Sequence, residues 1–198
     1  MRSRTLRAVR AAGGIFLATT ASFAGAAAQG GTKQMATRHI DVQRISVTSS
    51  KPFADVAAAL EAKIGHPDMS VFRGKITAAQ TQAEMEQVVQ GAVGPSGLME
   101  FARYDLGEVL RKESGGKDRR VLRLVVGNPL IMKQMVKPVP DAGSYAPVTI
   151  LIDERPDGVH LSYDRMASYL APYGSPEALK VARVLDSQIE ALLIAAAK

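Results

Sequence analysis

Apolar and polar residues alternate along five stretches of the chain, which is the period of a half-buried β-strand. The first stretch covers residues 38–49, with a bulge near Gln43 where the period slips. The second covers residues 98–110 and is kinked at Gly107. Three shorter stretches follow, at residues 120–126, 147–153 and 159–163. The pattern therefore predicts five strands.

Three other segments carry apolar residues at the three- and four-residue spacing of an α-helix. Residues 53–64 end before Gly65, residues 81–91 begin with a Thr81 cap, and the last segment begins with a Ser175 cap and runs over residues 176–192. A glycine after the last apolar position and a hydroxyl before the first one are typical helix boundaries. We predict a helix in each segment.

The remaining segments have weaker patterns. Residues 66–77 fit either a short strand around Val71 and Phe72 or a packed loop. Residues 130–145 fit a loop that begins with one helical turn. Residues 165–170 are predicted to form a short helix capped by Asp164, because a carboxylate accepts hydrogen bonds from the first backbone N–H groups of a helix.

The order of these elements predicts an α+β fold with a mainly antiparallel sheet and helices packed on one face. Two of the strand connections, at residues 114–117 and 155–158, are too short for parallel crossovers and are predicted to be hairpin turns. The central strands and the closing helix should share one core. The residues predicted to be buried in it are Leu124, Val126, Ile150, Ile152, Leu185 and Ile189.

The first 28 residues have the pattern of a secretory signal peptide. Four arginines precede an apolar run from Ala11 to Gly25, and three alanines before Gln29 offer a cleavage site. An uncleaved membrane anchor is the alternative, but the run is shorter than the ~20 residues that span a bilayer. We expect a signal peptide over 1–28, a disordered leader over 29–37 and one domain over 38–198, located in the periplasm or secreted.

Charge and cysteine content restrict the function. The chain has 25 Lys and Arg against 19 Asp and Glu, and removing the four arginines of the signal leaves 21 against 19, a balance of +2. Neither this balance nor export favours nucleic acid as a partner. The chain has no cysteine, which excludes thiol catalysis, iron–sulfur clusters and c-type haem attachment. We expect no cofactor and no membrane span after cleavage.

Several short motifs together resemble one known family. They are Ser50-Lys51-Pro52-Phe53 before a helix, Val126-Gly127-Asn128-Pro129 before a methionine-containing stretch, Pro156-Asp157-Gly158 in a hairpin and Tyr163-Asp164-Arg165 after it. In this order and spacing they resemble the DUF302 domain, whose biochemical role is not established. The resemblance covers about residues 38–193.

The resemblance implies a fold similar to that of the TATA-binding protein, with one strand, one helix, four strands and a closing helix. It also implies a homodimer, since such domains are often dimeric, and it implies no DNA binding. The helix over residues 82–91 resembles an addition found in some members. Met166 departs from the pattern, because the longer members carry proline there.

Four residues at strand ends are the candidate ligand-binding site: Asn128, Tyr163, Asp164 and Arg165. Ligand sites gather at strand ends and loops. The arginine fork suits a carboxylate or a sulfur oxyanion. The alternative is structural: Asn128 specifies a turn, Asp164 caps a helix, and Arg165 pairs with a nearby acid.

A metal site has only weak signals. Met132 and Met135 are two thioethers that can select Cu(I), although methionines in such a stretch usually fill a core. His160 lies opposite Asp153 and Glu154 in the predicted hairpin, but His39 and His66 lack ligand spacing to it. We therefore expect no metal and no catalytic residue from these patterns.

Three hypotheses about function stay open. The first is a binding or accessory module whose partner is a small molecule or a periplasmic protein. The second is an enzyme with a strand-end pocket, in which Arg165, Asp164 or His160 would have a strongly shifted pKa. The third is a structural dimerisation domain without a pocket, which would expose an apolar face.

Overall fold

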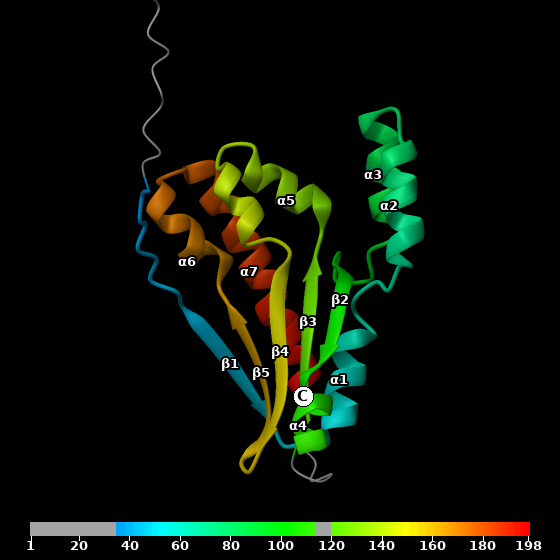
Figure 1. Cartoon of the computed structure of the whole chain (residues 1–198), viewed down its shortest axis with the longest axis vertical. Coiled ribbons are helices and arrows are strands. Elements are labelled where there is room, and N and C mark those ends of the chain that lie inside the picture. Colours follow the sequence, from blue (N-terminus) through cyan, green and yellow to red (C-terminus); the bar gives the residue numbers. More distant parts are fainter. Residues whose placement is uncertain (1–34, 114–119) are drawn as a thin grey trace, which may run out of the picture. The chain divides into compact units, whose positions relative to one another are not determined.

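The computed structural model describes residues 35–113 and 120–198 (Figure 1). The chain divides into two units, residues 1–37 and residues 38–198, and the fold described below is that of the second. The predicted signal peptide over residues 1–28, most of the predicted leader and the predicted loop at residues 114–117 lie outside the described residues.

Five strands form one antiparallel sheet, as predicted. Their order across the sheet is β1-β5-β4-β3-β2, so β1 and β2 are the two edges (Figure 1). The predicted turn at residues 155–158 joins β4 to β5. The strands are β1 (Arg44–Ser49), β2 (Met99–Asp105), β3 (Val121–Gly127), β4 (Val148–Arg155) and β5 (Gly158–Asp164).

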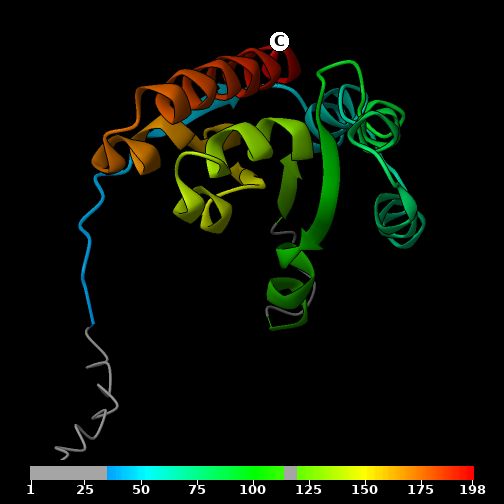
Figure 2. The ribbon, with the colours of Figure 1, turned by 90° about the horizontal axis from the view of Figure 1, so that it is seen from above.

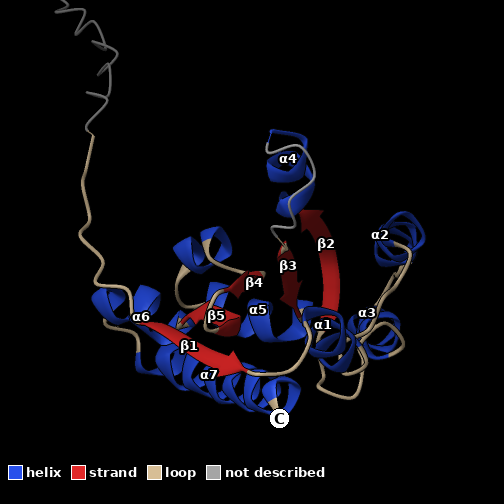
Figure 3. Cartoon of the chain, turned by 90° about the horizontal axis from the view of Figure 1, so that it is seen from below, coloured by secondary structure: helices blue, strands red, loops and turns tan. Residues whose placement is uncertain are grey.

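Helix α7 (Pro176–Ala197) and helix α1 (Phe53–Glu61) lie on the same face of the sheet, and Figures 2 and 3 show α7 running across it. The Ser175 hydroxyl caps α7 by accepting from the Ala178 N–H, as predicted. All six residues predicted for the core are buried and belong to one cluster beneath these helices. The predicted α+β class with an antiparallel sheet is therefore confirmed.

Two segments at the upper ends of the strands position the candidate residues. Helix α5 (Pro129–Val136) follows β3 and leads through a short 3-10 turn (Pro140–Ser144) to β4. Helix α6 (Met166–Leu170) follows β5 and leads through a second 3-10 turn (Ala171–Tyr173) to α7. The prediction of one helical turn after Asn128 was too short, because α5 has eight residues.

Most of the segment 66–77 is helical, from Met69 onward, so the prediction of a strand or loop there was wrong. Helix α2 (Met69–Ala78) begins with Asp68, whose carboxylate accepts from the N–H groups of Ser70 and Val71. Helix α3 (Gln82–Gln90) follows, with the predicted Thr81 cap. The two helices share a small apolar cluster with Met99 of β2. This tertiary contact buries the apolar side of α2, which the weak periodicity of residues 66–77 did not indicate.

The second predicted strand is too long. β2 ends at Asp105, and residues 106–113 form helix α4 (Leu106–Glu113) instead of continuing past a kink at Gly107. The Asp105 carboxylate accepts from the Glu108 N–H at 3.0 Å, which is a helix-initiating contact. Glu108 then pairs with Lys112 one turn later. Local helix contacts therefore ended the strand.

The two edges of the sheet are not alike. At the β2 edge, Gly65 forms a parallel bridge with Met99, and the Glu100 N–H donates to the Gly65 carbonyl at 2.8 Å. A Cβ on Gly65 would lie 2.0 Å from the carbonyl oxygen of Ala92, so only glycine permits this approach. A register shift in β2 between Glu100 and Ala102 interrupts that edge further. No comparable cover lies against β1 among the described residues.

Candidate functional site

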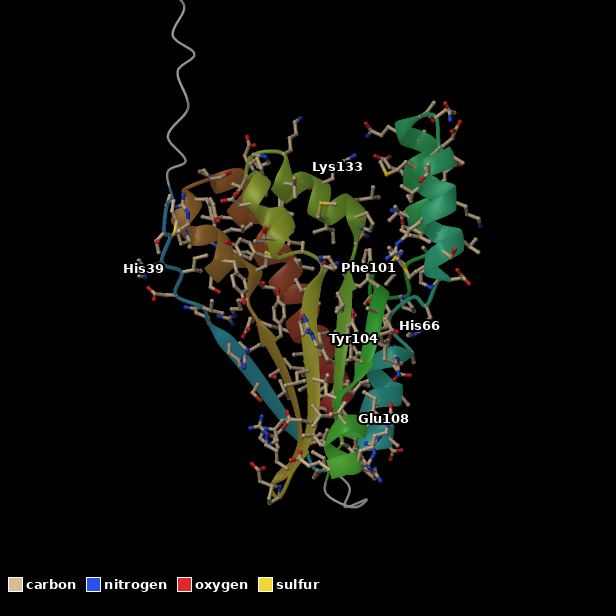
Figure 4. The ribbon with its side chains drawn as sticks, viewed as in Figure 1. His39, His66, Phe101, Tyr104, Glu108 and Lys133 are labelled. Atoms are coloured by element: carbon tan, nitrogen blue, oxygen red, sulfur yellow. The ribbon has the colours of Figure 1, made fainter. Side chains whose placement is uncertain are left out.

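An open groove of about 560 Å³ lies between the extended segment ahead of β1, helix α6 and helix α7. Figure 4 labels His39 on that segment, at the outer margin of the domain. The groove contains one of the four predicted site residues, Arg165. Its polar walls are formed by His39, Asp41, Gln43, Arg165, Ser168, Arg183, Asp186, Ser187 and Glu190.

Arg165 lies at the end of β5 and pairs with a nearby acid, as the structural alternative predicted. Its Nε donates to the Glu190 carboxylate at 2.8 Å, and a second guanidinium nitrogen donates to the Gln43 side-chain oxygen at 3.3 Å. These contacts join α7 to the segment ahead of β1. Because the Arg165 side chain is still 37% exposed, part of its donor fork remains open to the groove.

Asp186 forms a buried hydrogen-bonding centre on α7. Its carboxylate, in a residue only 4% exposed, accepts from the Tyr163 hydroxyl at 2.7 Å and from the N–H groups of Met166 and Ala167 at 2.7 and 3.1 Å. It therefore caps α6 from a distant helix. The methionine at position 166 supplies an N–H that the proline expected there would lack.

Tyr163 is a core residue rather than a groove residue. It is 1% exposed, and its hydroxyl both donates to Asp186 and accepts from the Met166 N–H at 3.1 Å. Burial, followed by the neighbouring Asp186 carboxylate, raises the pKa of the Tyr163 hydroxyl. A raised pKa keeps this hydroxyl protonated and suits it to hold the helix end together.

Asp164 does not cap α6, so that part of the prediction was wrong. Its carboxylate accepts two hydrogen bonds from the Arg44 guanidinium, at 2.6 and 2.7 Å, across the β1–β5 pair. The Tyr169 hydroxyl adds a third contact at 3.4 Å. The hydrogen bond from Arg44 lowers the pKa of Asp164 below its ordinary value of 3.8. The strand register places residue 44 directly opposite residue 164, so the Asp164 carboxylate contacts Arg44 instead of the end of α6.

The Asp164–Arg44 pair should make stability depend on pH. Because the pKa of Asp164 is lower in the folded chain than in the unfolded chain, the pair stabilises the fold above about pH 4 and loses that effect as pH falls through the lowered pKa. We expect Asp164→Asn to reduce the free energy of unfolding at pH 7 by only about 1 kcal/mol, since the Arg44 side chain is 66% exposed.

Urea unfolding of both proteins between pH 7 and pH 2 checks this expectation. The difference between Asp164→Asn and the parent should shrink as the pH falls toward 2. Arg44→Gln is the matched partner variant, and the double variant should cost little more than either single one. Additive effects of the two substitutions would show that the pair contributes nothing.

Asn128 lies away from the groove and closes the end of β3. Its side-chain oxygen accepts from the Leu130 N–H at 2.8 Å, and its amide donates to the Gly97 carbonyl at 2.9 Å. It therefore caps α5 and ties the helix to the loop before β2. Asn128 also lines a separate apolar cavity of about 80 Å³, together with Phe101, Met132, Met135 and Leu185 among others.

The residues named for a metal site fall in two places. Met132 and Met135 both line the apolar cavity, where Met135 is fully buried in the core, and His160 is not among the lining residues. His160 is on β5, paired in register with Asp153, and its ring bonds Asp157 at 2.9 Å. In the described part of the chain, no group of three histidine, aspartate or glutamate side chains is arranged to hold a metal ion.

Two features of this region were not predicted from the sequence. Tyr145, Tyr169 and Tyr173 gather from separate segments; the rings of Tyr145 and Tyr169 stack with centroids 4.8 Å apart, and the hydroxyls of Tyr145 and Tyr173 lie 2.8 Å apart. Arg38 covers the Tyr173 ring at 4.3 Å and donates to the Pro172 carbonyl. The cluster fixes the segment ahead of β1 as a wall of the groove.

The second feature is an uncompensated charge on each side of the groove. Arg183 on α7 and Asp41 on the opposite segment are both exposed, and neither has an ion-pair partner within residues 35–113 and 120–198. By contrast, Arg165, Glu190 and Asp186 are all engaged. Asp41 and Arg183 are far apart in the sequence, and only the packing of α7 brings the two residues to one groove. The sequence alone therefore does not indicate that they share a site.

Across these same described residues, no helix has both the length and the apolar composition needed to cross a membrane.

The sequence matches the profile of one known protein family. The profile of the family described as "Domain of unknown function DUF302" matches residues 74–196, which is more than half of the chain. The chain belongs to the DUF302 family. The match includes every candidate residue from Asn128 to Glu190, whereas β1 and the segment ahead of it lie before its start.

A crystal structure of an uncharacterized conserved DUF302 protein from Bacillus stearothermophilus has a similar fold. It is 11% identical in sequence, with a TM-score of 0.54, and the alignment covers 77% of this chain and 97% of that one. At this identity the likeness concerns the fold alone. No curated protein matches the DUF302 chain in a sequence search.

Proposed function

We propose that this DUF302 domain is an exported binding module that holds a small ligand by a carboxylate group in the groove between residues 39–43, α6 and α7. The observation that carries the proposal is the uncompensated Arg183 guanidinium on the wall of a groove that the partly open fork of Arg165 also lines. Arginine presents donors in a fixed fork that matches both oxygens of a carboxylate.

The opposite wall supports a ligand with a donor close to its carboxylate. Asp41 lacks a partner in the described part of the chain and faces the same groove, where it accepts from an ammonium or an amide N–H. A volume of about 560 Å³ lies in the range of small-molecule sites. Amino acids and N-acyl amino acids have this chemistry.

Export is the other half of the proposal. The four arginines, the apolar run and the three alanines ahead of Gln29 support it, and the absence of cysteine is compatible with an oxidising compartment. A free amino acid or peptide fragment is a ligand that an exported domain can meet outside the cytoplasm.

A matched pair of probes tests the groove. N-acetylleucine and N-acetylleucinamide differ only at the carboxyl group, which is a charged carboxylate in the first and a neutral amide in the second. We expect the acid to bind about tenfold or more tightly than the amide, because a hydrogen bond to a charged group is worth about 1.5–3 kcal/mol. Titration followed by NMR measures both affinities and locates the shifted resonances.

The variant Arg183→Gln should weaken binding of the acid by a similar factor and leave the amide unchanged. Lys180→Gln is the control, because Lys180 is an exposed cation on the same helix and does not line the groove. Equal affinities for acid and amide, or equal losses in the two variants, would remove the carboxylate site.

A further inference from the structure

The outer edge of β1 has unpaired backbone groups. The Arg165 N–H donates to the Gln43 carbonyl, and the register pairs Ile45 with Tyr163 and Val47 with Leu161. In an antiparallel pair, alternate residues direct both backbone groups to the partner strand. The N–H and C=O groups of Arg44, Ser46 and Thr48 therefore point away from β5, and none has a partner among the described residues.

Helix α7 forms a shelf beside this edge. At one end of β1, Arg165 links Gln43 to Glu190, and at the other end the Ser49 hydroxyl donates to the Ala197 carbonyl at 2.6 Å. Glu190, Ile194 and Ala197 follow one another at helical spacing, so they form one stripe beside the strand. Ile194 is 45% exposed on this stripe. Figure 3 shows α7 running alongside β1.

The shelf continues into the groove. Arg183 and Ser187 lie on the same stripe of α7, two turns and one turn before Glu190 respectively, and both line the groove. The segment 39–43 that forms the opposite wall leads directly into β1. The unpaired strand edge and the uncompensated Arg183 are therefore parts of one continuous surface.

We propose that this surface binds the carboxyl-terminal segment of a polypeptide in extended conformation, added to the sheet as a strand beside β1. This inference rests on the proposed function and names its ligand class. The terminal carboxylate would meet Arg183 in the groove, so the peptide would run antiparallel to β1. The outward groups of Arg44, Ser46 and Thr48 would pair with alternate peptide residues, and an apolar side chain would cover Ile194.

A second copy of the chain is the competing occupant of the edge. Two β1 strands related by a two-fold axis at Ser46 would pair Arg44 with Thr48 of the other copy, without a clash of like charges. That arrangement uses the edge but places nothing against Arg183 or Asp41. A peptide with a free carboxyl end uses the edge and the groove together, and the observations favour it for that reason.

Selection from peptide pools tests the proposal without prior choice of a sequence. The full chain, processed as in the cell, is offered N-acetylated random hexapeptides with free carboxyl ends and the same pool with amidated ends. Six extended residues span about 20 Å, which suffices to run from the groove along β1. We expect enrichment from the acid pool only, with affinities about tenfold or more above that of N-acetylleucine.

Backbone methylation of a selected peptide distinguishes strand addition from other modes. Methylating one amide nitrogen removes a donor and blocks pairing, so alternate methylated positions should lose about tenfold in affinity and the positions between them little. On the protein, Ser46→Pro removes an outward N–H from an edge strand while leaving the β1–β5 ladder intact. It should weaken peptide binding about tenfold and leave N-acetylleucine binding unchanged, whereas Ser46→Val should change neither.

Each failure has a distinct meaning. If a selected peptide binds but methylation at alternate positions does not lower its affinity more than methylation at the positions between, strand addition is wrong. The groove proposal would still stand. A dimer in sedimentation that Ser46→Pro dissociates would assign the edge to a second copy and overturn the peptide proposal. If neither N-acetylleucine nor any peptide binds, both proposals fall.

Discussion

Replacing Asp186 by Ala is expected to lower the free energy of unfolding by about 3–5 kcal/mol, because the loss leaves buried donors without an acceptor. The carboxylate accepts from the Tyr163 hydroxyl and from two N–H groups at the start of α6. In the variant, α6 would lose its cap and Tyr163 its hydrogen-bond acceptor in the core. Urea unfolding measured by circular dichroism gives the change.

Tyr163→Phe is the matched comparison, because it removes one of the three bonds to Asp186 and keeps the ring in the core. It should cost about 1 kcal/mol. Asp186→Asn, which keeps one acceptor oxygen, should fall between the two. A loss below about 1 kcal/mol for Asp186→Ala would mean that water from the adjacent groove replaces the carboxylate without difficulty.

Replacing Leu185 by Ala is expected to cost about 2–5 kcal/mol. Leu185 is 2% exposed and packs in the main core, where it also lines the apolar cavity beside α5. Truncation removes apolar contacts and enlarges a cavity that is already present, so the surroundings cannot collapse fully onto the new space. Thermal or urea unfolding measures the difference.

The neighbouring residue provides the control. Val184 is on the same helix but 56% exposed, and Val184→Ala should stay within about 0.5 kcal/mol of the parent. If Leu185→Ala also cost less than about 0.5 kcal/mol, α7 would have to pack against the sheet through another face.

The predictions of the strands and of the closing helix were correct where the apolar residues kept one spacing over a whole segment. The core residues from Leu124 to Ile189 follow from period two in the strands and period 3.6 in α7, since each period places one face on the core. The pattern failed at residues 106–113, where Leu106 and Leu110, four residues apart, share one face in a strand as well as in a helix. It also failed at residues 66–77, where the apolar partner is Met99 of β2.

Of the four residues predicted for a binding site, only Arg165 lines the groove between α6 and α7, and it pairs there with Glu190. Whether it binds a ligand stays a prediction. Asn128 has a structural partner for each side-chain group, and Tyr163 is a core residue. Asp164 pairs with Arg44 on the neighbouring strand. The two residues are 120 positions apart in the chain, so no local motif could indicate the pair.

The sequence by itself determined the α+β class, the hairpin turn at residues 155–158, the inward faces of the strands and of the closing helix, and membership of the DUF302 family through the order of its motifs. These properties depend on local periodicity and on turn residues, which are readable along the chain. Tertiary structure alone decided which polar groups far apart in the sequence contact one another. Asp186 caps a helix from another element, and Arg183 and Asp41 line one groove, because the packing of α7 against β1 and α6 brings together residues far apart in the sequence.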